Sequence, residues 1–308
     1  MTPTLMCVPN ISEGRNLATV EAVVDEIRRV RGAKLLDYSS DEHHNRSVLT
    51  FLGQPDAVLE AAQAMAAKAL ELIDMRRHTG SHPRLGAVDV APFVPVRNLE
   101  TKDAVDIARR FGRFVGRLGV PVYYYEDAAT RPERCNLADI RKGEYEGLPQ
   151  KLADPAWQPD EGPAVFNAMS GAMVTGARFP LIAFNVNLRT TDLSIAQGIA
   201  RAIRHINGGY RFVRAIGLAL EDRGMVQVST NLTNHSKTPI HRVLETIRDE
   251  AARHGVNIAN TELVGPVPLA ALEELVHHYL QAHEFSMNQV IETALIAVVP
   301  CSRKGEEG

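Results

Sequence analysis

The first 126 residues alternate between two hydrophobic periods. Short runs of β-forming residues are followed by segments in which apolar residues recur every three or four positions, the spacing of an amphipathic helix. This pattern predicts strands at residues 5–11, 33–37, 46–52, 87–96 and 120–126, and helices at 16–30, 55–74 and 101–118, with Thr101 as the cap of the last helix. The predicted order is β-α-β-β-α-β, followed by an extra α-β.

The second half repeats this order. We expect strands at residues 181–188, 214–220, 226–232 and 256–264, and helices at 192–206, 239–254 and 268–282. Two strands joined by a short turn, with helices between the other strands, are typical of a ferredoxin-like sandwich. The sequence therefore predicts an α/β (α+β) fold of two ferredoxin-like βαββαβ subdomains, residues 1–178 and 179–308, flanking a groove suited to a ligand.

Residues 128–177 interrupt the pattern. The segment contains Pro132, Pro149, Pro155, Pro159 and Pro163 and shows little periodicity. We expect a long structured loop, and loops of this length inside a compact domain are usually functional or disordered.

Composition excludes several classes of protein. The 308 residues include 34 Lys+Arg and 37 Asp+Glu, a formal charge of −3, which argues against nucleic-acid binding. The sequence begins without a basic, apolar leader and contains no apolar run of membrane-spanning length. Cys7, Cys135 and Cys301 are too scattered for a disulfide framework. We expect a cytoplasmic protein without a membrane span.

The densest polar segment is RRHTGSHPRLGAVD, residues 76–89. Gly80 and Pro83 disfavour a helix there, so the two imidazoles lie on a loop. A histidine titrates near neutral pH and suits proton transfer. We expect His82, held before Pro83, to be functional, and His78 to be a surface residue or a helix cap.

A second polar cluster occupies residues 39–46, between two predicted strands. Together with His78 and His82 it offers ligands for zinc or manganese, but no pair of histidines has the helical spacing of a metal motif. The alternative is that its polar side chains bind substrate or support the site: Asp41, Asn45 and Arg46.

Small residues dominate the segment 162–178. They would let the backbone approach a flat ligand closely, although a plain linker of small residues is an equally good interpretation. Asn185 and Asn187 share one face of a predicted strand, and a ligand groove is one place where their amides would find partners.

Several collinear blocks resemble one known family. They are CVPNISEGRN, HNRSVLTFLG, IDMRRHTGSHPRLGAVDVAPFVPV, IRKGEYEGLPQKL, TGAR, LIAFNVNL and QVSTNLTN, spread over nearly the whole chain. Together they resemble the glutamate formimidoyltransferases, in the stand-alone form without a cyclodeaminase domain. The resemblance implies transfer of a formimidoyl group from N-formimidoyl-L-glutamate to the co-substrate tetrahydrofolate, giving 5-formimidoyltetrahydrofolate and L-glutamate in histidine degradation. It also implies a homodimer and no metal.

The resemblance assigns roles to residues. It places the catalytic histidine at His82, and Asp41, Arg46 and Arg84 are candidates for holding the charged groups of the donor. Ser39 and Ser170 depart from the animal pattern, which has an acidic and an aromatic residue there. The implied folate-binding stretch is Gly162, Pro163, Ala164, Val165, Phe166, Asn167, Ala168, Met169, Ser170 and Gly171.

Three other functions compete with this one. Formyl transfer between glutamate and tetrahydrofolate needs the same residues. A metal-dependent amidine hydrolase would use His43, His44, His78 and His82. An RNA-binding module is disfavoured because the strands lack the aromatic block of such domains and the chain is net negative.

Overall fold

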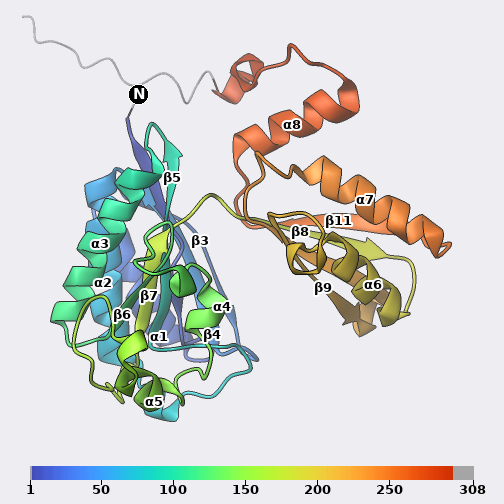
Figure 1. Ribbon diagram of the computed structural model, residues 1–308. Coiled ribbons are helices and arrows are strands. Elements are labelled where there is room, and N and C mark those ends of the chain that lie inside the picture. The colour runs from blue at the N-terminus through green and yellow to red at the C-terminus, as the bar shows by residue number, and fades with distance from the viewer. Residues whose placement is uncertain (1, 294–308) are drawn as a thin grey trace, which may run out of the picture. The chain divides into compact units, whose positions relative to one another are not determined.

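The computed structural model describes residues 2–293 (Figure 1). Contacts between residues divide the chain into two compact units, an N-terminal unit of residues 2–179 and a C-terminal unit that begins at residue 180. Within the described residues, no helix has the length and apolar character needed to cross a membrane. Cys7 is buried and Cys135 is exposed, both as free thiols, and Cys301 lies outside the described part of the chain.

The N-terminal unit is built on a seven-stranded sheet. β3 pairs antiparallel with β4, and β1 and β2 both lie between β4 and β5 and pair antiparallel with each of them. Beyond β5, the strands β7 and β6 extend the sheet in parallel. The strands are β1 (Thr4–Cys7), β2 (Asn10–Ile11), β3 (Ala33–Asp41), β4 (Arg46–Gly53), β5 (Val88–Arg97), β6 (Val122–Glu126) and β7 (Met173–Ala177).

Three amphipathic helices pack against this sheet: α1 (Leu17–Arg29), α2 (Pro55–Leu72) and α3 (Thr101–Arg117). Their buried side chains form one apolar core with the strands, in which the Phe93 and Phe111 rings lie edge to face at 5.5 Å. Burial of this apolar surface is the main favourable term for the fold.

Residues 127–172 contain short helices rather than a long loop. The helices α4 (Leu137–Ile140) and α5 (Leu148–Ala153) form a second core with Tyr123 and Tyr125 of β6. The prediction of a loop up to residue 177 was also wrong at its end, because β7 pairs inside the sheet between β5 and β6. A strand of small residues and one glycine carries little β-forming signal, yet its burial on both sides stabilises it.

The C-terminal unit has a four-stranded antiparallel sheet in the order β11-β8-β10-β9. Its side chains form a separate apolar core with the helices. The elements are β8 (Ile182–Leu188), α6 (Leu193–Ile203), β9 (Val213–Leu220), β10 (Met225–Leu232), α7 (Ile240–Arg253), β11 (Ile258–Val264) and α8 (Leu269–Leu280).

The predicted order of strands and helices is confirmed in the C-terminal unit and, apart from the split of the first strand, up to β6 in the N-terminal unit, and the fold is mixed α/β. Three local details differ from the prediction. Pro9 falls between β1 and β2, so the expected single strand is broken, and β3 continues to Asp41 through polar residues. Glu100, not Thr101, is the N-cap of α3, and its backbone N–H donates to Asp103 at 2.8 Å.

Candidate active site

Two segments of the N-terminal unit form the site: the loop of residues 78–87, which leads into β5, and the turn of residues 42–45 between β3 and β4. They touch at Gly80, where an added Cβ would lie 2.3 Å from the His44 carbonyl oxygen. Only glycine permits this approach. The Ser81 N–H donates to the His43 carbonyl at 3.3 Å and joins the segments again.

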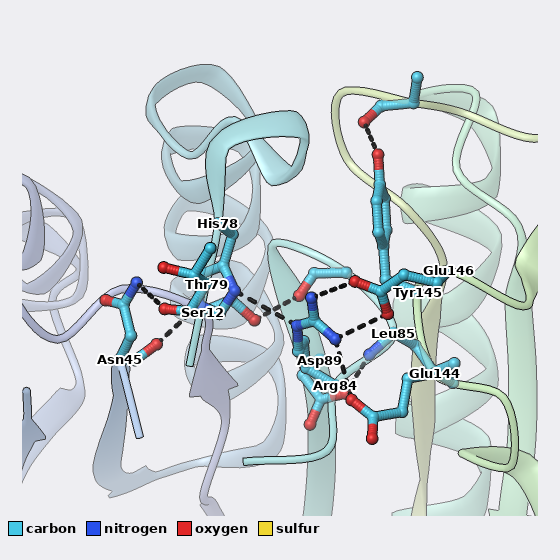
Figure 2. A network of polar contacts seen from close by, with 12 residues as sticks. Ser12, Asn45, His78, Thr79, Arg84, Leu85, Asp89, Glu144, Tyr145 and Glu146 are labelled. Atoms are coloured by element: carbon cyan, nitrogen blue, oxygen red, sulfur yellow. Dashed lines mark hydrogen bonds and ion pairs between the residues drawn. The ribbon is translucent and has the colours of Figure 1, made fainter. Parts of the chain in front are cut away.

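Asn45 connects three segments of backbone. Its φ of 48° lies in the left-handed region that asparagine tolerates better than most residues. Its Oδ1 accepts from the Gly14 N–H at 3.0 Å. Its Nδ2 donates to the Thr79 carbonyl, also at 3.0 Å (Figure 2). We expected a substrate or supporting role for Asn45, and in this structure its amide supports the site.

Arg84 lies at the centre of the polar network in Figure 2. Its side chain is 9% exposed and pairs with Glu144 at 2.9 Å and with both carboxylate oxygens of Glu146 at 2.9 and 2.6 Å. Its Nε donates to His78 Nδ1 at 3.3 Å. The guanidinium already holds two carboxylates of its own chain, so this geometry does not support the expectation that Arg84 clamps the donor.

His78 is part of the same network. Because Nδ1 accepts from Arg84, Nε2 carries the proton and donates to the Asn45 carbonyl at 2.8 Å. Burial lowers the pKa of His78, and the charge of Arg84 contributes to that decrease. The expectation of a helix-capping residue is met by the backbone of His78, which caps the 3₁₀ helix Met75–Arg77. The expectation of a surface imidazole was wrong, because the ring is half-buried and links the loop to the β3–β4 turn.

His82 is half-buried beside Arg46. Its Nε2 lies 2.5 Å from Arg46 Nη1, and the His44 ring stands edge-on to it with 5.9 Å between centroids. Burial and, to a smaller extent, the positive charges of Arg46 and Arg141 together lower the pKa of His82 to about 3. The imidazole is therefore neutral at neutral pH.

Arg46 has no carboxylate within ion-pair distance among residues 2–293. Burial lowers its pKa, and the nearby charge of Arg141 acts in the same direction. Arg141 follows α4 and forms an ion pair with Asp89, which is 2% exposed and also accepts from the Leu85 N–H at 2.9 Å. The Nε of Arg141 is buried and has no hydrogen-bond partner among the described residues.

A small pocket lies at the centre of these residues. Its side chains are packed so closely that no space of the size of a water molecule remains between them, so a ligand group could enter only if a lining side chain moved. It is lined by Ser12, His44, Asn45, Arg46, His78, His82, Arg84 and Asp89.

Asp41 ends β3 on the exposed side of the turn. Its carboxylate accepts from the His44 N–H and contacts His44 Nδ1, each at 2.8 Å. These two bonds lower the pKa of Asp41. Asp41 therefore stabilises the turn that presents Arg46 and keeps a solvent-exposed negative charge near it.

The stretch from Gly162 to Gly171 borders the histidine loop at its far end. The Ser170 carbonyl accepts from the Ala87 N–H, and the Met169 carbonyl accepts from the Met75 N–H, both at 2.9 Å. At the other end, Gly162 has a φ of 80° and a Cβ there would lie 2.3 Å from the Val120 carbonyl. The exposed part between them includes Val165 and Met169, while Phe166 packs against Tyr145.

Asn185 and Asn187 lie on β8 of the C-terminal unit, where a polar network satisfies them. Asn187 donates to Asn260 at 2.6 Å and to Glu262 at 2.9 Å, and it accepts from Gln227 at 2.8 Å. Hydrogen bonds from Asn187 and, to a smaller extent, from Asn185 lower the pKa of the Glu262 carboxylate.

Sequence reasoning missed four residues of the N-terminal network: Asp89, Arg141, Glu144 and Glu146. The last three belong to the block IRKGEYEGLPQKL, whose alternating charges look like a solvated helix face. Among residues 2–293, no group of three or more His, Cys, Asp or Glu side chains is placed to hold a metal ion.

Comparison with known proteins gives the family. The model of the formiminotransferase domain, N-terminal subdomain, matches residues 4–178, and that of the formiminotransferase domain matches residues 183–301. The chain belongs to the formiminotransferase family. Both units are therefore formiminotransferase subdomains, and the family resemblance of the sequence is confirmed.

Curated members of the family align along most of the chain. A glutamate formimidoyltransferase of Streptococcus pyogenes serotype M1 is 45% identical over 298 residues, covering 96% of this chain and 100% of that protein. A glutamate formimidoyltransferase of Thermoplasma acidophilum is 46% identical, covering 93% and 95%. The formimidoyltransferase-cyclodeaminase of Rattus norvegicus is 44% identical, but the match covers 91% of this chain and 53% of that longer protein.

Proposed function

We propose that this chain is a glutamate formimidoyltransferase, which moves the formimidoyl group of N-formimidoyl-L-glutamate to tetrahydrofolate. The observation that carries this function is the 45% identity to a curated enzyme of that name over nearly all of both chains. The neutral imidazole of His82 beside unmatched positive charge gives the family reaction a chemical basis in this structure.

The reaction needs two proton transfers. The donor is a protonated amidine, and attack by N5 of tetrahydrofolate gives a tetrahedral carbon between two nitrogens. N5 must lose a proton and the departing glutamate nitrogen must gain one, while no oxyanion develops. A single imidazole serves both steps when its pKa lies near the working pH. We assign both transfers to His82, with Asp41 near the amidinium cation and Arg46 toward a carboxylate of the donor.

Several further parts of this proposal rest on the order of the elements, on composition and on the family. We propose that each unit is a ferredoxin-like sandwich. The stretch from Gly162 to Gly171 would contact the folate, which is consistent with its exposed side chains and its bonds to the histidine loop. We also propose a homodimer in the cytoplasm.

Replacing His82 tests the assignment. His82→Ala is expected to lower kcat about 10²- to 10⁴-fold, the usual effect of losing a general acid-base, while tetrahydrofolate still binds. Transfer is followed by pterin absorbance with formimidoyl-glutamate and, in parallel, formyl-glutamate, which identifies the donor. His43→Ala, on the adjacent exposed turn, is the control and should keep its activity. Near-normal turnover of His82→Ala removes His82 from the mechanism, and loss of activity with a chelator would instead favour the metal hydrolase.

A further inference from the structure

Among the three arginines closest to His82, Arg46 is the one without an ion pair. Arg84 has Glu144 and Glu146, Arg141 has Asp89, and Arg134 has Asp160. Arg46 is partly buried. Its guanidinium contacts the neutral imidazole of His82, and no carboxylate of the described residues lies within ion-pair distance of it. Buried charges in proteins are normally paired, so an unmatched guanidinium at a pocket indicates a missing anion.

The contact with Arg46 also occupies the Nε2 lone pair of the His82 imidazole. The Pro83 backbone bonds one ring nitrogen of His82, and Arg46 donates to the lone pair of the other nitrogen, Nε2. A guanidinium has only donors, so Nε2 is the acceptor. While Arg46 stays there, His82 has no free lone pair with which to remove a proton from a substrate.

We infer that Arg46 and Arg141 form a carboxylate subsite, and that a donor carboxylate binding there draws Arg46 away from His82 Nε2. This inference rests on the proposed function, because it names how the donor reaches the site. The ligand class is a carboxylate, since guanidinium groups bind that group through paired hydrogen bonds. Arg141 is close enough for its charge to act on both Arg46 and His82.

The surrounding charges support an anion at this point. The negative groups are already engaged: Asp89 with Arg141, Glu144 and Glu146 with Arg84, and Asp41 with His44. The charged and titratable groups that face His82 or its neighbours are Asp41, His44, Arg46, His78, Arg84, Asp89, Arg141, Glu144 and Glu146. Asp89 and Asp41 act on Arg46 from a longer distance, but within this set no carboxylate bonds directly to its guanidinium.

Binding of the carboxylate would have two effects on His82. It frees Nε2 to accept a proton, and it compensates the positive charge that disfavours the imidazolium. An opposite charge within about 4–6 Å typically changes a pKa by 1–3 units. The imidazole would therefore become basic only once the donor has bound, which limits unproductive protonation of the empty site.

NMR titration of the His82 ring in the full chain tests the inference. L-Glutamate, the amino acid that the reaction releases, serves as the probe, and His82→Gln identifies the resonance. Saturating L-glutamate is expected to raise the pKa of His82 by about 1 unit or more. The dimethyl ester of L-glutamate, which lacks both carboxylates, should leave it unchanged.

Variants assign the effect to residues. Arg46→Gln should raise the pKa of His82 in the free protein and abolish its response to glutamate. Arg141→Gln should weaken glutamate binding about 10- to 100-fold, the equivalent of a lost charged hydrogen bond. Arg15→Gln is the matched control: Arg15 donates to the Glu42 carbonyl at 2.9 Å and to Thr79 at 3.2 Å in the same two loops, without contacting His82.

An unchanged pKa of His82 at the highest glutamate concentration, or a full response in Arg46→Gln, overturns the inference. Failure of the proposed function gives a different result, because a protein without formimidoyl transfer can still show the glutamate-dependent titration. The transfer assay and the titration therefore fail independently.

Discussion

Two arginines of the N-terminal unit have contrasting surroundings. Arg134 is 1% exposed, pairs with Asp160 at 2.8 Å, donates to the Ala156 and Gln158 carbonyls, and lies over the rings of Tyr123 and Trp157. Arg46 lines a pocket and contacts a neutral imidazole. The matched cation fastens the segment of residues 127–172 to the sheet, whereas the unmatched cation is available to a ligand. The absence of an ion pair therefore distinguishes Arg46 from Arg134.

The C-terminal unit supports this distinction. Glu262 accepts from Asn187, Gln227 and Arg223, so its network has one anion, one cation and several amides, all engaged. It resembles the Arg134 cluster rather than the Arg46 pocket. We expect this network to orient β8, β10 and β11. In the N-terminal unit, replacing arginines that have an ion pair should lower stability more than replacing Arg46, which has none.

The largest effect on stability is expected at Arg134. Arg134→Met leaves the Asp160 carboxylate buried without its partner, which typically costs about 3–5 kcal/mol of unfolding free energy. Urea denaturation followed by circular dichroism measures this loss. Arg131→Met is the control, because Arg131 is exposed and its single bond goes to the same Ala156 carbonyl. Equal stability of the two variants would contradict the structural role of Arg134.

A smaller loss is expected at Arg84. Arg84→Met removes the partner of Glu144 and Glu146 and leaves His78 Nδ1 without its donor, but both carboxylates are partly exposed and water can solvate them. We expect a loss of about 1–3 kcal/mol in the same urea assay. Arg77→Met, at an almost fully exposed neighbour, should change stability by less than about 0.5 kcal/mol.

Acid sensitivity is a third test. The pKa of His82 falls from the ordinary 6.5 to about 3 in the folded protein, so between these values the unfolded chain binds more protons. Stability is therefore lost as the pH falls from about 6.5 toward 3. His82→Gln, whose side chain cannot titrate, should show a shallower decline in urea midpoint between pH 7 and pH 4. An identical decline in both proteins would show that His82 titrates normally.

The smallest change in stability is expected at Arg46. Arg46→Met removes an unmatched charge from a half-buried position, so the unfolding free energy should change by less than about 1 kcal/mol in either direction. Donor turnover should nevertheless fall. A variant that loses several kcal/mol would place Arg46 with Arg134 among the structural cations and remove the contrast between them.

The elements with strong periodicity were predictable from sequence. The helix at Leu17–Arg29 and the hairpin of β9 and β10 lie within a few residues of their predicted bounds, because each buries one apolar face. β7 was missed because its sequence MVTGA has no alternation, and its pairing depends on two strands far away in the chain. Local pattern cannot show a partner that only the tertiary fold supplies.

The site was predictable only in part. The sequence indicated the loop of His82 and the turn of Arg46, because polar residues and glycine interrupt two strands there. It could not indicate that Arg84 is matched and Arg46 is not, since Glu144 and Glu146 lie 60 and 62 residues after Arg84. Charge matching depends on distances in space, and a charged run reads from sequence as a solvated surface.

The contact at Gly80 has a consequence for how the site could diverge. Since a Cβ there would lie 2.3 Å from the His44 carbonyl oxygen, an alanine would act as a wedge between the two segments that carry His82 and Arg46. The absence of a Cβ at Gly80 thus sets the distance between His82 and Arg46. A substitution of Gly80 would therefore separate the His82 imidazole from the Arg46 guanidinium without changing any charged residue.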